Sequence, residues 1–288
     1  MNHIQSTTLR PDLPIGVFDS GIGGLTVVRQ LINLLPQENI VYFGDTARVP
    51  YGNKSADVVR EYAAQDVKFL LSQNVKLIVV ACNTASAVAM DVVNAHSTVP
   101  AIGVIEPTAS EAIRLVGARG VGVIGTLSTI NSCAYSTALT KSKKDVKVVT
   151  QACPLFVPLA EEGMFDHPAT DIIAHEYLSQ FVGKVDVMIL GCTHYPLLRG
   201  AIAKAVGTGV KLVDSGEATA KAAKKLLSSA NMSNQSQTDP FGRKSKPRYE
   251  FYVSDFPQKF NDVAERFLGR KLEFARKVQI YSDGVITI

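Results

Sequence analysis

The sequence predicts an α/β protein made of two pseudo-symmetric open domains, each with a mostly parallel sheet, and an active site in the cleft between them. Short apolar runs of strand length alternate with amphipathic helical stretches, which is typical of parallel α/β sheets. Two of these runs end in nearly the same polar stretch, one around Cys82 and one around Cys192. Motifs also recur in the same order at a nearly constant spacing, which indicates an internal duplication.

Composition favours a soluble globular enzyme or binding protein. The 288 residues are enough for two domains, 46% are hydrophobic and 19% are charged. The net charge of +4 is small, and the one dense basic cluster, at 243–248, has no interleaved aromatic residues for stacking on bases. We therefore expect no nucleic-acid partner.

Targeting signals and metal motifs are not evident in the sequence. Residues 1–13 are polar and contain no apolar core of a signal peptide, and no apolar run reaches membrane-spanning length. Four cysteines occur at 82, 133, 153 and 192, never as C-x-x-C, and there are only five histidines. These counts predict a cytoplasmic protein with reduced thiols, no membrane association and no metal site.

The first half opens with an apolar strand over 15–18, followed by the glycine-rich stretch 19–24 and a helix over 25–35. The glycine spacing fits neither G-x-G-x-x-G nor a P-loop, so a nucleotide site is not predicted. Asp19 has two interpretations, a helix cap or a carboxylate facing the cleft, and this stretch alone favours the cap. The remaining elements expected in this half are a strand at 40–44, a functional loop through Val49-Pro50-Tyr51-Gly52, a helix at 55–73, a strand at 77–80 and a helix at 85–94.

The pattern then repeats. Gly16-Val17-Phe18 is matched by Gly122-Val123-Ile124, Val49-Pro50 by Val157-Pro158, and Cys82 by Cys192, at offsets of 106 (16 to 122), 108 (49 to 157) and 110 (82 to 192) residues. Two similar halves related by an approximate two-fold axis would place both cysteine strands against one shared cleft.

Further elements are expected in the second half and beyond it. Cys133 falls in a helical stretch at 128–139 and is predicted to be a buried small hydrophobic residue, whereas Cys153 follows a strand at 147–150 and is expected near the cleft. The other expected elements are strands at 187–190 and 210–213, a helix to 227, a mobile loop at 228–247, a strand at 249–253, a helix at 258–268 and a final strand.

Cys82 and Cys192 carry the chemical prediction. Ligands bind at the carboxyl ends of parallel strands, and a thiol placed there before a helix N-terminus is expected to ionise easily. One thiol on each face of a cleft suits inversion at a carbon, with one thiolate removing a proton while the opposite thiol delivers one. Asn83, Thr84 and Thr193 are neutral donors suited to a carboxylate whose charge grows in the reaction.

Three alternatives are open at this point. Both cysteines could serve only as packing residues, because cysteine is among the most buried residue types. Cys192 and His194 could belong to a Cys-His hydrolase, which would leave Cys82 and its polar neighbours unexplained. The two lobes could close on an amino acid without turnover, a role that has no use for paired thiols.

Four motifs, together with their order, resemble those of the glutamate racemases in the cofactor-independent aspartate/glutamate racemase superfamily. They are Phe18–Gly24, Val49–Gly52, Ala81–Ala85 and Gly191–Pro196. The stretch Cys153–Gly163 also fits the family pattern. Aspartate-specific relatives usually carry Glu where this chain has His194, so the resemblance favours glutamate over aspartate.

The resemblance implies proton transfer that interconverts L- and D-glutamate without PLP, metal or other cofactor, and supplies D-glutamate for peptidoglycan. In the family, the equivalent of Cys82 deprotonates D-glutamate and the equivalent of Cys192 deprotonates L-glutamate. Asp19, Glu161 (rather than Glu162) and His194 would assist. The implied substrate contacts are Asp19, Ser20, Tyr51, Gly52, Asn83, Thr84, Thr193 and His194.

The resemblance also has implications for domain boundaries, oligomeric state and regulation. In the family the closing segment returns to the N-terminal half, which implies a discontinuous first domain at 1–100 plus 210–288 and a second domain at 101–209. Family members are monomers or homodimers, and some Gram-negative members are activated by a peptidoglycan precursor. Either oligomeric state, and regulation of that kind, are open for this chain.

Overall fold

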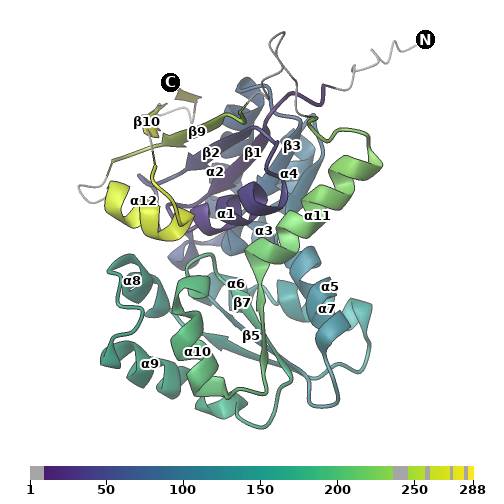
Figure 1. The fold of residues 1–288 in the computed structure, drawn as a ribbon, viewed down its shortest axis with the longest axis vertical. Helices are drawn as coiled ribbons and strands as arrows, with labels where there is room; N and C mark the ends of the chain where they lie inside the picture. Colours follow the sequence, from purple (N-terminus) through teal and green to yellow (C-terminus); the bar gives the residue numbers. More distant parts are fainter. Residues whose placement is uncertain (1–9, 236–245, 257–259, 273–274, 282–284) are drawn as a thin grey trace.

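The computed structural model describes residues 10–235, 246–256, 260–272, 275–281 and 285–288. Helices alternate with strands along these residues, and the strands form two main parallel sheets, one in each of two stacked lobes (Figure 1). The predicted α/β class with mostly parallel sheets is therefore confirmed.

The first sheet has six strands in the order β10-β9-β2-β1-β3-β4, all paired in parallel. Its strands are β1 (Ile15–Asp19), β2 (Ile40–Gly44), β3 (Leu77–Val80), β4 (Ala101–Gly103), β9 (Tyr249–Val253) and β10 (Ala275–Lys277). The second sheet has four parallel strands in the order β6-β5-β7-β8. These are β5 (Val121–Gly125), β6 (Val148–Ala152), β7 (Val187–Gly191) and β8 (Lys211–Asp214).

The strand orders show the internal duplication directly. The run β2-β1-β3-β4 has the same connectivity as β6-β5-β7-β8, so β1 corresponds to β5 and β3 to β7. Phe18 of β1 pairs with Val80 of β3, and Ile124 of β5 pairs in the same way with Leu190 of β7. The strands that precede the two cysteines are thus equivalent in the two halves.

Helices cover the faces of both sheets. Those of the first half and its return are α1 (Leu25–Leu34), η1 (Tyr51–Asn53), α2 (Ala56–Ser72), α3 (Asn83–Val88), α4 (Met90–His96) and α12 (Phe260–Leu268). The others are α5 (Ile105–Leu115), α6 (Leu127–Asn131), α7 (Ala134–Ser142), α8 (Phe156–Glu161), α9 (Pro168–Leu178), η2 (Ser179–Phe181), η3 (Tyr195–Leu198), α10 (Arg199–Val206) and α11 (Ser215–Ser229). A small antiparallel pair, β11 (Gln279–Ile280) and β12 (Ile286–Thr287), lies near the C-terminus.

Two predicted helices are each divided in two. The helix expected at 85–94 breaks at Ala89 into α3 and α4. The helix expected at 128–139 breaks at Cys133, which has a left-handed backbone (φ 56°) and is exposed, so its predicted burial is wrong. The Ser132 hydroxyl donates to the Thr129 carbonyl and accepts from the Ala134 amide, and such local bonds compete with helix continuation.

The sheets also bear on the expected domain boundaries. Strand β4 pairs with β3 in the first sheet, although a boundary at 100/101 would place it in the second domain. Strand β8 pairs with β7 in the second sheet, although a boundary at 209/210 would place it in the first. The division into domains stays a proposal. If strand pairing defines the domains, the chain passes into the second domain after residue 103 and returns to the first after residue 214.

The closing segment returns to the first half. Strand β9 extends the first sheet beside β2, and α12 packs against α1 and lies near α8 of the other lobe (Figure 1). One apolar cluster contains residues from both lobes, including Leu25 of α1, Phe156 of α8 and Phe267 of α12. Apolar packing therefore joins the two halves along this side of the cleft.

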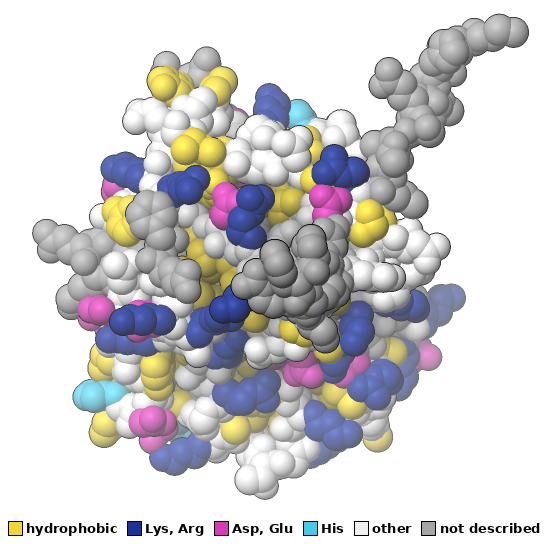
Figure 2. All heavy atoms as spheres, turned by 45° about the horizontal axis from the view of Figure 1, so that its top comes forward, with side chains coloured by type: hydrophobic (Ala, Val, Ile, Leu, Met, Phe, Trp, Pro, Cys, Tyr) yellow, Lys and Arg dark blue, Asp and Glu magenta, His cyan; other side chains and the backbone are white. Residues whose placement is uncertain are grey.

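The surface seen in Figure 2 carries Lys and Arg side chains dispersed among acidic, apolar and uncharged ones. Among the described residues, no helix is long and apolar enough to cross a membrane.

Candidate active site

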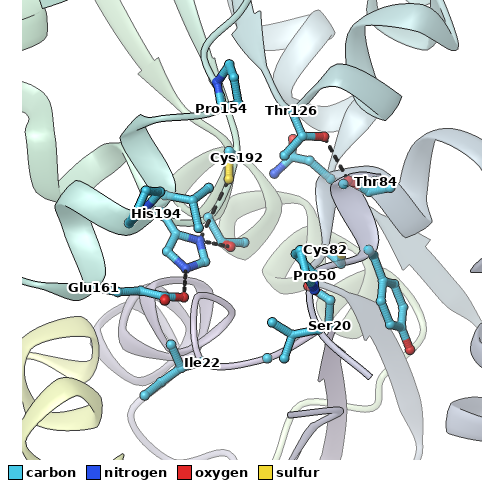
Figure 3. A pocket seen from close by; sticks show the side chains of 18 of the residues that line it. Ser20, Ile22, Pro50, Cys82, Thr84, Thr126, Pro154, Glu161, Cys192 and His194 are labelled. Atoms are coloured by element: carbon cyan, nitrogen blue, oxygen red, sulfur yellow. Dashed lines mark hydrogen bonds and ion pairs between the residues drawn. The ribbon is translucent and has the colours of Figure 1, made fainter. Parts of the chain in front are cut away.

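A cavity of about 550 Å³ lies between the two halves, at the carboxyl ends of β1, β3, β5 and β7 (Figure 3). Both halves and the closing segment contribute to its wall. The lining includes Ser20, Gly21, Ile22, Tyr51, Gly52, Cys82, Asn83, Thr84, Thr126, Pro154, Glu161, Glu162, Cys192, Thr193, His194, Asp262, Val263 and Arg266. Nearly all sequence-predicted site residues thus meet here; Asp19 lies behind the lining formed by Ser20 and Gly21.

Cys82 and Cys192 both line this cavity and are only 5% and 6% exposed. Cys82 is the N-cap of α3, and its Sγ accepts a weak hydrogen bond from the Ala85 amide at 3.5 Å. Cys192 follows β7 directly but precedes the short 3₁₀ helix η3, and α10 begins only at Arg199. The predicted helix N-terminus is therefore present at Cys82 and wrong at Cys192.

The ionisation of Cys82 differs from the sequence-based expectation. Burial and, to a smaller extent, the nearby Asp19 charge raise the pKa of the Cys82 thiol to about 12. The Ala85 amide and Ser20 act in the opposite direction but are weaker. Because the cost of burying a thiolate exceeds the benefit of the helix N-terminus, Cys82 holds its proton in this cavity.

His194 gives Cys192 a different environment. Its Nδ1 lies 3.7 Å from Cys192 Sγ, and its Nε2 lies 2.9 Å from Glu161 Oε1 (Figure 3). Burial would lower the pKa of His194, but hydrogen bonds with Cys192 and Glu161, together with the charges of both partners, raise it to about 10. The two sulfurs therefore have different electrostatic neighbours: an imidazole held by a carboxylate at Cys192, and the buried Asp19 carboxyl at Cys82.

Asp19 binds backbone amides at the start of α1, although the N-cap residue itself is Gly24, and it does not line the cavity. Its Oδ2 accepts hydrogen bonds from the amides of Gly21 at 3.1 Å and Gly24 at 3.0 Å, at the start of α1. Its Oδ1 is buried and has no hydrogen-bond partner among the described residues. Burial raises the pKa of Asp19, although the positive charge of His194 opposes this effect. A half-satisfied buried carboxyl of this kind can hold a proton.

Three threonine hydroxyls connect the two halves across the cavity. Thr84 Oγ1 of α3 lies 3.0 Å from Thr126 Oγ1 and 3.3 Å from Thr129 Oγ1, and the last two are 2.9 Å apart. Thr126 was not among the predicted site residues. It follows β5 as Ser20 follows β1, so the duplication itself contained the signal that could have identified it.

Two predicted substrate contacts have their polar groups engaged elsewhere. Asn83 Oδ1 accepts from the Tyr135 hydroxyl at 2.6 Å, and its Nδ2 donates to Ser215 Oγ at 3.3 Å. The Tyr51 hydroxyl donates to Asp45 Oδ2 at 2.5 Å. Both residues line the cavity, but each polar group of the two side chains already makes at least one hydrogen bond within the protein.

The glycine-rich stretch allows the two halves to approach closely. A Cβ placed on Gly23 would lie 2.2 Å from Thr193 Oγ1 and 2.5 Å from His194 Cε1, closer than atoms can pack. A Cβ on Gly52 would lie 2.8 Å from Thr126 Cβ. These glycines are needed for contact between the halves, which accounts for a glycine pattern that fits no nucleotide motif.

Cys153 lies behind the cavity and is not part of its lining. It is fully buried, its Sγ donates to the Gln151 carbonyl at 3.7 Å, and burial raises its pKa. Its carbonyl accepts from the Tyr195 hydroxyl at 2.9 Å. Among the residues that the structure describes, no group of three His, Cys, Asp or Glu is arranged to hold a metal ion.

Helix α12 contributes wall residues that the sequence analysis did not foresee. Asp262, Val263 and Arg266 line the cavity. The closing segment falls outside the duplication, so no repeated motif indicated its position near the cysteines.

Comparison with known proteins identifies several relatives. A family model described as Asp/Glu/Hydantoin racemase matches residues 15–223. The glutamate racemase of Syntrophus aciditrophicus (strain SB) is 48% identical over 272 residues, which is 94% of this chain and 98% of the relative. A crystal structure of glutamate racemase from Francisella tularensis in complex with D-glutamate has a TM-score of 0.86 and 42% identity, covering 94% of this chain and 98% of its own. The Escherichia coli glutamate racemase, solved with L-glutamate and the activator UDP-MurNAc-Ala, has a TM-score of 0.75 and 26% identity, covering 94% and 100%.

Proposed function

Because the chain belongs to the Asp/Glu/hydantoin racemase family, and so to the isomerases, we propose that it interconverts L- and D-glutamate with Cys82 and Cys192 as its two bases. The single observation that carries this proposal is the placement of both thiols. Each follows the equivalent strand of a duplicated half, and both line one cavity. Glutamate, rather than aspartate, is supported by the relatives and by histidine at position 194.

Starting from L-glutamate, the Cys192 thiolate removes the α-proton, and the electron pair left on Cα spreads onto the carboxylate. The Cys82 thiol delivers its proton to the opposite face, giving D-glutamate with Cys82 as thiolate and Cys192 as thiol. The reverse reaction uses the same groups with their roles exchanged. Hydroxyls of Thr84 and Thr193 line the cavity, where they can donate to the substrate carboxylate as its charge increases.

Asp19, Glu161 and His194 serve the two thiols separately. His194, held by Glu161 at 2.9 Å, stabilises the Cys192 thiolate in the direction from L- to D-glutamate. Asp19 is electrostatically coupled to Cys82 and carries one unpaired buried oxygen, so it assists when Cys82 gains or loses its proton. Glu161, rather than Glu162, is the assisting glutamate because it contacts the imidazole.

Several further features belong to the same proposal. The reaction needs no PLP, metal or other cofactor, since the thiols carry both proton transfers. In the cytoplasm the reaction would supply D-glutamate for peptidoglycan. The protein could act as a monomer or as a homodimer, because one chain forms the complete cavity. The E. coli relative binds the activator UDP-MurNAc-Ala, so a precursor of that chemical class is the proposed regulator.

Solvent-isotope incorporation tests the two-thiol proposal. In D₂O, protiated L-glutamate should yield D-glutamate carrying deuterium at Cα in almost every molecule. The remaining L-glutamate should stay protiated at low conversion, because the thiol on its own face holds the proton just removed. NMR of the separated enantiomers measures both. Substantial protium in early D-glutamate would show that one base serves both faces.

Substrate choice is tested with the same protein. Polarimetry with L-glutamate and with L-aspartate, without added cofactor, should show loss of rotation for glutamate alone. Equal or faster loss with aspartate would contradict the assignment of glutamate.

A further inference from the structure

Helix α12 is the part of the closing segment that lies nearest to the second thiol, Cys192. Its residues Ala264, Phe267 and Leu268 are buried, and it packs against α1. The helix ends at Gly269, which has φ +72° and whose Cα lies so close to Arg29 of α1 that an added Cβ would lie 2.8 Å from the Arg29 Cδ. The helix is thus anchored to the first half while its inner face reaches the second half.

The imidazole of His194 is confined on several sides. Nδ1 faces Cys192, Nε2 bonds Glu161, and the backbone of Gly23 lies against Cε1. The imidazole also contacts Phe267, whose ring centroid lies 5.0 Å from that of His194 with an interplanar angle of 81°, and Thr193 Oγ1 lies 3.4 Å from Nδ1. This edge-on geometry is favourable for aromatic pairs, and Phe267 is fully buried, so its ring is a fixed wall for the imidazole.

The same turn of α12 also contacts the partner of His194. Arg266 Nη1 donates to the backbone carbonyl of Glu161 at 3.4 Å, and the guanidinium lies beside Gly163, just after α8. Adjacent residues of one helix therefore contact both members of the Glu161–His194 pair. Neither residue belongs to a repeated motif, because α12 has no counterpart in the duplication.

We propose that Phe267 is a positioning residue for the racemase reaction: it holds the His194 imidazole in the orientation that bridges Cys192 and Glu161. This inference rests on the proposed two-thiol function. It assigns to the closing segment an effect on one base, Cys192, with no corresponding effect on Cys82. Without the Phe267 ring, the imidazole gains freedom to turn away from the line between Cys192 and Glu161.

Racemisation itself cannot reveal an effect on one base. The enantiomers have equal free energies, so kcat/KM must change equally in both directions. Elimination from 3-chloroglutamate needs only one base: a thiolate takes the α-proton, its electron pair forms the Cα–Cβ double bond, and chloride leaves with the C–Cl pair. The resulting enamine hydrolyses to 2-oxoglutarate and ammonia. The L-configured analogue reports on Cys192 and the D-configured one on Cys82.

The experiment compares the full-length protein with Phe267→Leu, which keeps an apolar side chain but removes the ring. Elimination from the L-analogue should slow by about five- to tenfold, the upper part of the rate effect expected for one aromatic pair, while that from the D-analogue changes by less than about twofold. NMR titration should also show a lowered pKa for His194. The matched control is Leu268→Met, a buried neighbour in the same helix, which should leave both rates and the His194 titration unchanged. Phe267→Met replaces Phe267→Leu if the latter does not fold.

Equal slowing of both analogues, or no slowing of either, would overturn the positioning role, as would an unchanged His194 titration. Failure of the proposed function looks different: the unaltered protein would then neither racemise glutamate nor eliminate chloride from either analogue. That result would also overturn the positioning role of Phe267.

Discussion

Replacing Glu161 with glutamine removes the carboxylate that faces His194 while keeping nearly the same shape. Glu161 Oε1 lies 2.9 Å from His194 Nε2, and the Glu161 side chain is 39% exposed. Glu162 is adjacent, also lines the cavity and makes no such contact, so Glu162→Gln is the matched control. The pair of variants separates the effect of this carboxylate from the general loss of a negative charge.

The magnitude follows from the environment of His194. Its pKa is raised from 6.5 to about 10, which corresponds to about 5 kcal/mol in favour of the imidazolium. Cys192 is the larger contributor and Glu161 the next. A hydrogen bond to a charged group contributes about 1.5–3 kcal/mol, and partial exposure of Glu161 reduces this to about 1–2 kcal/mol. The variant should therefore lower the pKa of His194 by about one pH unit and slow racemisation by about 5- to 30-fold.

The same shift predicts a pH dependence of stability. The folded protein has the higher His194 pKa, so this group's stabilisation is complete below the unfolded value near 6.5 and is lost as pH rises towards about 10. In Glu161→Gln the stabilisation contributed by His194 should be smaller, and its loss should be complete at a pH about one unit lower. Histidine NMR titration and urea unfolding across this pH range measure both effects. An unchanged titration in Glu161→Gln, or an equal change in Glu162→Gln, would refute the reasoning.

Three further predictions concern the thiols, the contact between the halves and cofactors. Cys82→Ala and Cys192→Ala should each lower the racemisation rate by at least ~10²–10⁴, whereas the exposed Cys133→Ala should not; near-normal turnover of Cys82→Ala would contradict the two-thiol mechanism. Gly23→Ala should reduce kcat/KM by at least about tenfold, because an added Cβ meets the second half, while Gly209→Ala has open space and serves as control; equal activities of the two variants would contradict this packing argument. Racemisation should survive extensive dialysis against EDTA and hydroxylamine, and recovery only on adding PLP or a divalent ion would show that the mechanism is wrong.

Local sequence signals predicted most strands and helices and the cysteine pair. Apolar runs such as Leu77–Val80 and Val187–Gly191 are strands of parallel sheets, whose residues are apolar because both faces of the sheet are covered. The repeated offsets predicted the equivalence of the two halves, which the strand orders confirm. These signals lie within one helix or strand or in its repeat, so they can be recognised without knowing which elements pack together.

Only the tertiary structure decided the properties that depend on neighbours distant in sequence. The pKa of Cys82 is set by burial in the closed cavity, and that of His194 by its contacts with Cys192 and Glu161. The exposure of Cys133 depends on a backbone break that helical periodicity does not reveal.

The position of α12 is the clearest case. Its amphipathic sequence predicts a helix but says nothing of which surface its apolar face covers. In the structure Phe267 meets His194, a residue 73 positions earlier in the chain, because β9 returns the closing segment to the first sheet beside β2. Patterns along the sequence report on local conformation and burial, whereas the environment of a titrating group is set by long-range contacts. The proposed chemistry was therefore readable from the two cysteine motifs, but the different surroundings of the two thiols became visible only in the folded chain.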